Sequence, residues 1–154
     1  ISHGQQQAWW MSFGSILQVP EWLVAGRERE FLSYFYSRHA YDPTAIGPGD
    51  LDEYTRCYAS PGGMRSGFSY YRTLAEDIQS FRQLPSPACP VLSVGGRQRL
   101  GALVAASIRQ CAPHTQEAII DRCGHYPAEE QPAALTGLLR RFFAPPSPHE
   151  DAAR

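Results

Sequence analysis

The chain has 154 residues, of which 43% are hydrophobic and 19% are charged, and its formal net charge is −1. This is about the length of one domain and is enough to bury a core. The near-neutral charge excludes a strongly basic nucleic-acid binder as the default interpretation. No apolar run approaches the roughly 18 residues that a membrane span needs. We therefore expect neither nucleic acid nor a membrane as a partner.

The first residues indicate the middle of a longer protein. The sequence starts at Ile1 and continues as His3-Gly4-Gln5-Gln6-Gln7-Ala8-Trp9-Trp10, without an initiator Met. The basic and apolar regions of a signal peptide are absent from this stretch. We expect a fragment or a truncated product. Localisation stays open, with the cytoplasm favoured because no signal peptide is visible.

Four cysteines, Cys57, Cys89, Cys111 and Cys123, are spaced without a CxxC pair. Only Cys123 and His125 lie close together, and two neighbouring ligands without a second pair do not make a zinc site. We expect reduced, mostly buried thiols. This spacing predicts no metal site.

The first half predicts helices and no strands. Residues 20–38 carry apolar side chains at helical spacing, and Pro20 suits a first turn. Asp42-Pro43 then interrupts the helical pattern. Asp50-Leu51-Asp52-Glu53 resembles an acidic capping box that begins a helix through about Ala59, and Pro61-Gly62-Gly63 ends it. A third helix is predicted from about residue 66 to 84, with one face formed by Phe68, Tyr71, Leu74, Ile78 and Phe81.

The second half predicts an alternation of strands and helices. A short apolar run at 90–96 ends in two glycines, as in a buried parallel strand. A helix at 103–111, a strand at 117–121, a loop at 123–127 and an amphipathic helix at 128–143 follow. That last helix places Leu135, Leu138, Leu139 and Phe142 inward. The order is typical of an α/β sheet. Two strands alone do not make a stable core of this kind, so we expect further strands to be missing or supplied by another chain.

Two segments carry candidate chemistry. His125 follows a predicted parallel strand, where open α/β sheets place ligands and catalytic groups, and a neutral imidazole there can act as a general base. The alternative is an ordinary loop histidine. Tyr71 either donates a hydrogen bond to an oxygen that gains charge in the transition state or is a core aromatic of its helix. Trp9 and Trp10 either line an apolar pocket or simply pack.

Three segments together resemble α/β-hydrolases of the epoxide hydrolase and haloacid dehalogenase branch. They are Met64-Arg65 through Tyr70-Tyr71-Arg72, the strand Pro90-Val91-Leu92-Ser93-Val94-Gly95-Gly96, and Cys123-Gly124-His125-Tyr126-Pro127-Ala128-Glu129-Glu130-Gln131-Pro132. The order of a helical cap, a late strand, a final strand, a Gly-His loop and a closing helix matches as well. The resemblance reaches about Phe143. It implies a partial α/β-hydrolase fold, with residues 1–84 as the helical cap and 85–144 as the C-terminal part of the core. The charged terminal residues 145–154 are expected to form a disordered tail.

The resemblance implies roles for individual residues. His125 matches the catalytic histidine that activates water against an aspartyl ester, and Tyr71 matches the cap tyrosine that hydrogen-bonds the epoxide oxygen. Trp10 and Met11 occupy places where many relatives carry a His or a His-Trp pair, which leaves a second donor unassigned. Trp10, Met11 and Tyr70 are the expected substrate-binding residues. The expected substrate is small and apolar, such as an epoxide, and self-association of the chain is possible.

Two departures from the family pattern stand out. The nucleophile elbow and the oxyanion-hole strand, which precede the cap in the family, are not found in these residues. The loop Arg97-Gln98-Arg99-Leu100-Gly101, a common place for the triad acid, has no carboxylate. The resemblance gives neither Asp121 nor Glu129 that role. We expect a C-terminal portion of an epoxide-hydrolase-like enzyme, inactive alone. The alternatives are a haloacid dehalogenase or esterase of the same fold, or an inactive truncated product.

Overall fold

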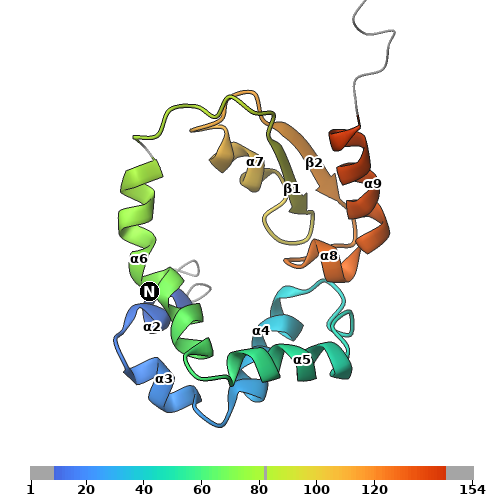
Figure 1. The fold of residues 1–154 in the computed structure, drawn as a ribbon. Coiled ribbons are helices and arrows are strands. Elements are labelled where there is room, and N and C mark those ends of the chain that lie inside the picture. Colours follow the sequence, from blue (N-terminus) through green and yellow to red (C-terminus); the bar gives the residue numbers. More distant parts are fainter. Residues whose placement is uncertain (1–8, 82, 145–154) are drawn as a thin grey trace, which may run out of the picture. The chain divides into compact units, whose positions relative to one another are not determined.

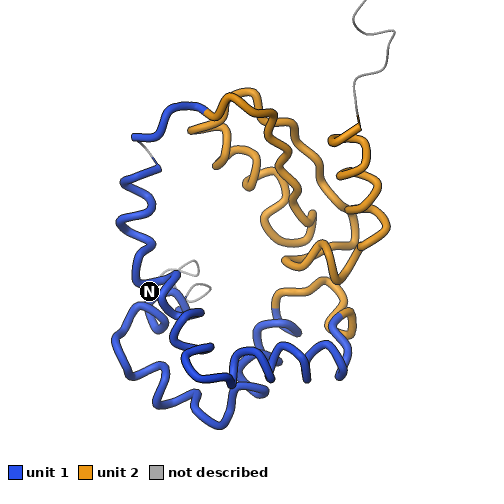
Figure 2. Tube along the Cα trace, in the orientation of Figure 1, with its two compact units in different colours: residues 1–38, 46–86 blue, residues 39–45, 87–154 orange. Residues whose placement is uncertain are grey.

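The computed structural model describes residues 9–81 and 83–144, and the chain divides into two compact units. Unit 1 comprises residues 1–38 and 46–86, and unit 2 comprises residues 39–45 and 87–154 (Figure 2). The short segment 39–45 therefore belongs with the second half of the sequence. The predicted disordered tail at 145–154 lies outside the described residues, as do the first eight residues.

Unit 1 is built from helices, and its described residues contain no strand, as the sequence predicts. Figure 1 shows them in chain order. The helices are α2 (Trp9–Ser15), α3 (Val19–Val24), α4 (Glu28–His39), α5 (Pro48–Tyr58) and α6 (Gly63–Phe81), with the last residue of α4 in unit 2.

Two predicted helix boundaries in unit 1 are wrong. The single helix expected at 20–38 is divided into α3 and α4, because Gly26 adopts φ +75°, a left-handed conformation that ends a helix. Helix α5 begins at Pro48, and Gly47 precedes it as the cap residue. Asp50 is the third helical residue, and its carboxylate accepts the Gly47 N–H at 3.0 Å. Asp50 therefore supports the helix start from inside the helix, and the cap predicted at Asp50 is corrected to Gly47.

An aromatic cluster forms the core of unit 1. Phe68 is only 3% exposed, and its ring centroid lies 5.9 Å from that of Phe13 and 5.8 Å from that of Phe31. The rest of the face predicted for α6 is less buried: Leu74, Ile78 and Phe81 are exposed. Helices α2, α3 and α5 contact α6, and Figure 1 shows them gathered around its beginning. Among the described residues, the apolar side chains toward the end of α6 are therefore less covered than those at its beginning.

A partly buried ion pair between Arg72 and Glu21 also joins two helices of unit 1. The Arg72 guanidinium on α6 donates to the Glu21 carboxylate on α3 at 2.8 Å and to the Ile16 carbonyl at 2.8 Å. The side chains of Arg72 and Glu21 are 15% and 22% exposed. Burial opposes the charge on Glu21, but hydrogen bonds from its own backbone and from Arg72 leave the pKa of Glu21 below its usual value. Arg72 thus fixes α6 against the 16–21 segment.

Unit 2 contains a parallel strand pair. Strands β1 (Leu92–Gly96) and β2 (Gln116–Ile120) are paired in a register that places Leu92 opposite Gln116 and Gly96 opposite Ile120. Helix α7 (Ala102–Ile108) contacts β1, and helix α9 (Pro132–Phe143) contacts β2. Figure 1 shows these two helices on opposite sides of the strand pair. This is the strand–helix–strand–helix order that the sequence predicts.

The closing helix predicted at 128–143 is divided in two. Helix α8 (Pro127–Glu130) ends before Gln131, and α9 starts at Pro132, because proline cannot donate the backbone hydrogen bond that would continue the helix. Leu135, Leu138 and Phe142 are half-buried, whereas Leu139 is 38% exposed. The predicted inward face is therefore confirmed for three of its four residues.

Within residues 9–81 and 83–144, no helix is long and apolar enough to cross a membrane. The same residues contain no group of three or more His, Cys, Asp or Glu side chains arranged to hold a metal ion.

Candidate functional site

The loop that follows β2 presents His125. Strand β2 ends at Ile120, and the chain turns through Arg122, whose φ is +48°. Cys123 and Gly124 are buried, and His125, which follows them, keeps part of its surface accessible. A residue at the carboxyl end of a parallel strand occupies the place where open α/β sheets position reactive groups. The structure therefore places His125 where the sequence predicts it.

Two glycines permit the backbone to pack tightly at this loop. A Cβ added to Gly96 would lie 2.0 Å from the Gly124 carbonyl oxygen, and one added to Gly124 would lie 2.4 Å from the His39 carbonyl oxygen. Real side chains do not tolerate such distances. The end of β1, the His125 loop and the segment beginning at His39 therefore require glycine at both positions.

Several hydrogen bonds fix the loop from its two sides. The His125 N–H donates to the His39 carbonyl at 2.9 Å, and the Gln98 side-chain oxygen accepts the Cys123 N–H at 2.9 Å. The single Gly124 N–H donates to both oxygens of the Glu130 carboxylate, at 2.9 and 3.0 Å. Local sequence patterns indicate no role for His39, Gln98 or Glu130. Glu130 lies within segment 123–132, one of the three segments that carry the family resemblance.

The imidazole of His125 lies among other rings. Its centroid is 5.9 Å from that of His39 and 5.2 Å from that of Tyr126, both in edge-on geometry. Partial burial and the nearby Arg99 charge hold the pKa of His125 below its usual 6.5, although the Glu130 charge opposes this shift. At neutral pH the imidazole is therefore uncharged, as a general base must be.

The other reactive groups of this loop are occupied or inert. Burial, assisted by the Glu130 charge, raises the pKa of the Cys123 thiol to about 11, so Cys123 is not a thiolate nucleophile at neutral pH. Asp121 is exposed and forms an ion pair with Arg97. The structure thus directs the Asp121 carboxylate toward that guanidinium, in keeping with the absence of an assigned catalytic role.

Tyr71 lies on α6 in unit 1, and its ring packs on α2. A Cβ added to the buried Gly14 would lie 2.5 Å from Cδ2 of Tyr71. Tyr71 is half-buried, and burial together with the nearby Tyr58 phenol raises its pKa above 10. Its hydroxyl therefore stays protonated and able to donate a hydrogen bond. Packing and donation are compatible at this residue, so the two interpretations from the sequence do not exclude each other.

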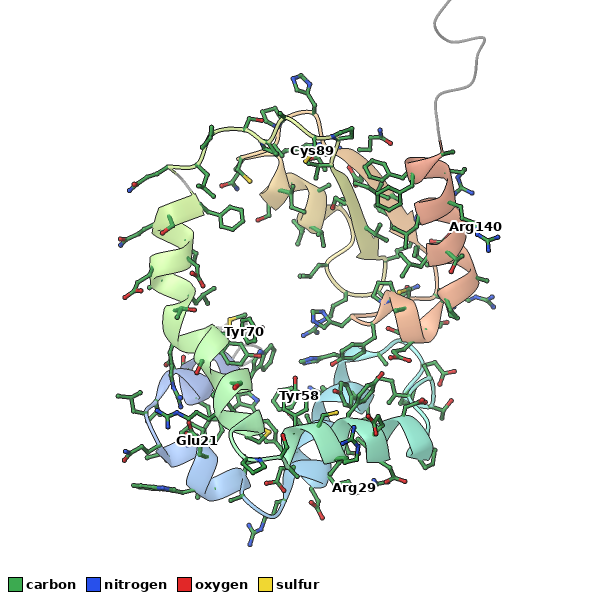
Figure 3. All side chains as sticks on the ribbon, in the orientation of Figure 1. Glu21, Arg29, Tyr58, Tyr70, Cys89 and Arg140 are labelled. Atoms are coloured by element: carbon green, nitrogen blue, oxygen red, sulfur yellow. The ribbon has the colours of Figure 1, made fainter. Side chains whose placement is uncertain are left out.

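The three predicted substrate-binding residues differ in burial. Trp10 is half-buried, and its ring lies 5.8 Å from that of Phe35 within the aromatic cluster. Met11 is 42% exposed, and Tyr70, labelled in Figure 3, is 77% exposed. Trp10 and Met11 are neighbours on α2, whereas Tyr70 is on α6. Tyr71 and these residues belong to unit 1, and His125 belongs to unit 2.

Comparison with known proteins assigns the class of this fold. No family model matches the sequence. The structure is similar to Cfl2 from Burkholderia cenocepacia, with 34% identity and a TM-score of 0.83, over 94% of this chain and 50% of that one. It is also similar to the epoxide hydrolase CorEH, with 24% identity and a TM-score of 0.82, over 94% of this chain and 53% of that one. The chain has part of an α/β-hydrolase fold.

A curated sequence narrows this class. The soluble epoxide hydrolase of Corynebacterium sp. (strain C12) is 29% identical over 133 residues, which are 82% of this chain and 46% of that protein. The chain spans about half the length of the relatives it matches. It is similar to proteins of the epoxide hydrolase-like branch of α/β-hydrolases over most of its own length and about half of theirs.

Proposed function

We propose that these residues are the cap and the C-terminal part of the core of an enzyme that opens epoxides. In this proposal, an aspartate outside the 154 residues attacks the epoxide carbon and forms an alkyl ester, while Tyr71 donates its hydroxyl proton to the leaving oxygen. His125 then takes a proton from water, and the resulting hydroxide attacks the ester carbonyl. The products are a diol and the regenerated aspartate, and the cycle closes when His125 releases its proton to solvent and the Tyr71 phenolate takes one up.

The observation that carries the proposal is the presentation of His125. Its imidazole is neutral at neutral pH and lies on a loop at the end of a parallel strand. Close backbone packing at Gly96 and Gly124 fixes this loop. A general base needs both a suitable pKa and a fixed position. The name of the Corynebacterium relative supports an epoxide as the substrate class.

The proposed role of Tyr71 rests on its protonation state and its fixed ring. Its raised pKa keeps the donor proton through neutral pH, and contact with Gly14 restricts the ring. Trp10, Met11 and Tyr70 are proposed to contact the apolar part of the substrate. A small epoxide is the substrate, and the function needs no cofactor, because ester formation and hydrolysis require only the side chains and water.

The experiment is an assay of the complete protein with a small terminal epoxide. We expect diol formation, and we expect Tyr71→Phe to slow turnover by about 10²-fold, as is typical for loss of one transition-state donor. Tyr34→Phe is the matched control and should change the rate far less, since Tyr34 is 46% exposed and has no proposed contact with the substrate. Halide release from a haloacid without any diol from the epoxide would overturn the proposal in favour of a dehalogenase. Equal turnover rates for the two variants would show that Tyr71 only packs in the core and does not donate a proton.

A second check concerns the nucleophile. The proposal requires a Gly-x-Asp-x-Gly type elbow encoded in frame before Ile1. A serine in place of that aspartate would indicate an esterase, and an in-frame stop codon would indicate an inactive truncated product.

A further inference from the structure

We propose that Glu130 is a positioning residue for His125, and that its single carboxylate holds the backbone on both sides of the histidine. The proposal rests on the proposed function for the role of His125 itself. The Gly124 N–H, just before the histidine, donates to both carboxylate oxygens at 2.9 and 3.0 Å. The Tyr126 N–H, just after it, donates to Oε1 at 3.0 Å. Glu130 therefore brackets His125.

The same carboxylate also binds a distant part of the sequence. The Tyr41 N–H donates to Oε2 of Glu130 at 2.6 Å, across a separation of 89 residues. Two residues earlier, the His39 carbonyl accepts the His125 N–H at 2.9 Å. Segment 39–45, which belongs to unit 2, is therefore joined to the histidine loop directly and through Glu130.

The chemistry of the three donors explains why the acceptor is a carboxylate. An ionised carboxylate has two oxygens with about four lone-pair sites and no proton, so it accepts all three N–H groups. A glutamine has one such oxygen, and its amide N–H₂ would face at least one of the backbone donors. A side chain at position 124 cannot provide the acceptor for these N–H groups, because a Cβ on the buried Gly124 would lie 2.6 Å from the Tyr41 nitrogen.

Glu130 also adds to the electrostatics of the imidazole. Arg99 and partial burial lower the pKa of His125, and the Glu130 charge opposes them, while the His39 ring lies edge-on to the same imidazole. Removal of the Glu130 charge therefore leaves a signature on His125 that a purely structural loss elsewhere would not produce.

The test compares Glu130→Gln with Asp121→Asn in the complete protein. Both variants remove one negative charge near His125 in sequence, but Asp121 pairs with the exposed Arg97. We expect Glu130→Gln to speed amide hydrogen exchange at Gly124, Tyr126 and Tyr41 by at least about tenfold. We also expect it to lower the midpoint of the His125 titration seen by NMR. Asp121→Asn should leave both readouts near the wild type.

Kinetics then separate positioning from stability. With an epoxide substrate, Glu130→Gln should reduce kcat about tenfold or more with little change in KM, because ester hydrolysis depends on the orientation of His125. If Glu130→Gln does not fold, Glu130→Asp keeps the charge, shortens the reach and is expected to show the same exchange pattern. Exchange rates that stay at wild-type values in a folded variant would overturn the proposal, as would faster exchange with unchanged kcat. If the wild type opens no epoxide, the proposed function fails, and exchange and titration still decide the role of Glu130.

Discussion

The two units hold their candidate residues by different physical means. In unit 1, Tyr71 rests on Gly14 beside a cluster of phenylalanine rings, so its place depends on side-chain packing. In unit 2, His125 is fixed by backbone contacts at Gly96 and Gly124 and by backbone hydrogen bonds. Side-chain cores accept changes that conserve volume, whereas close backbone approach accepts no added atom. We therefore expect the cluster around Phe68 to tolerate substitutions that keep side-chain volume, and the histidine loop to tolerate no side chain at Gly96 or Gly124.

Removal of the central ring of unit 1 should have the largest effect on stability. Phe68 is 3% exposed and contacts the rings of Phe13 and Phe31, so Phe68→Ala loses apolar burial and leaves a cavity. We expect the free energy of unfolding to fall by about 3–5 kcal/mol. Phe68→Leu keeps most of the volume and should cost much less. Denaturant unfolding measures both, and equal losses would contradict the view that this unit tolerates repacking.

A single added methyl group should be nearly as harmful in unit 2. In Gly124→Ala the new Cβ would meet the His39 carbonyl oxygen at 2.4 Å, and we expect a loss of about 3 kcal/mol with displacement of the loop. Gly49→Ala on helix α5 is the control, because no atom lies within 4 Å of a Cβ at that position. Denaturant midpoints of the two variants make the comparison. A Gly124→Ala protein as stable as Gly49→Ala would refute the backbone account of the loop.

The smallest expected effect is on pH dependence. Because the pKa of His125 in the folded chain lies below 6.5, the unfolded chain binds more protons as the pH falls through this value. Stability should therefore decrease from pH 7.5 to pH 5.5, and His125→Gln should remove this part of the dependence. The imidazole C–H resonance should titrate with a midpoint below 6.5. A midpoint above 6.5 would show that the Glu130 charge outweighs burial and Arg99.

Two features that depend on neighbouring residues in the sequence are predicted correctly. The apolar run ending in Gly95-Gly96 indicates β1, and the resemblance around Gly124-His125 indicates the loop, because both depend on neighbours in sequence. Pro132 marks the break between α8 and α9, whereas the apolar periodicity continues across it and therefore predicts one helix.

Other features depend on contacts that sequence patterns do not contain. The junction of Glu130 with Tyr41 spans 89 residues, so no local motif reveals it. The exposure of Ile78 and Phe81 depends on which helices surround α6, although their spacing alone indicated a buried face. Tyr71 is half-buried, so its ring can pack while its hydroxyl donates a hydrogen bond. The helical periodicity of the sequence therefore does not distinguish these two roles.

The central claim is that His125 acts as the base that hydrolyses an ester on the enzyme. The most direct measurement is intact-protein mass spectrometry of the His125→Gln variant of the complete protein, mixed with a small epoxide. The account predicts a stable mass increase equal to that of the epoxide, with wild-type protein returning to its original mass as diol accumulates. Full turnover by the variant without a trapped adduct would contradict the role assigned to His125.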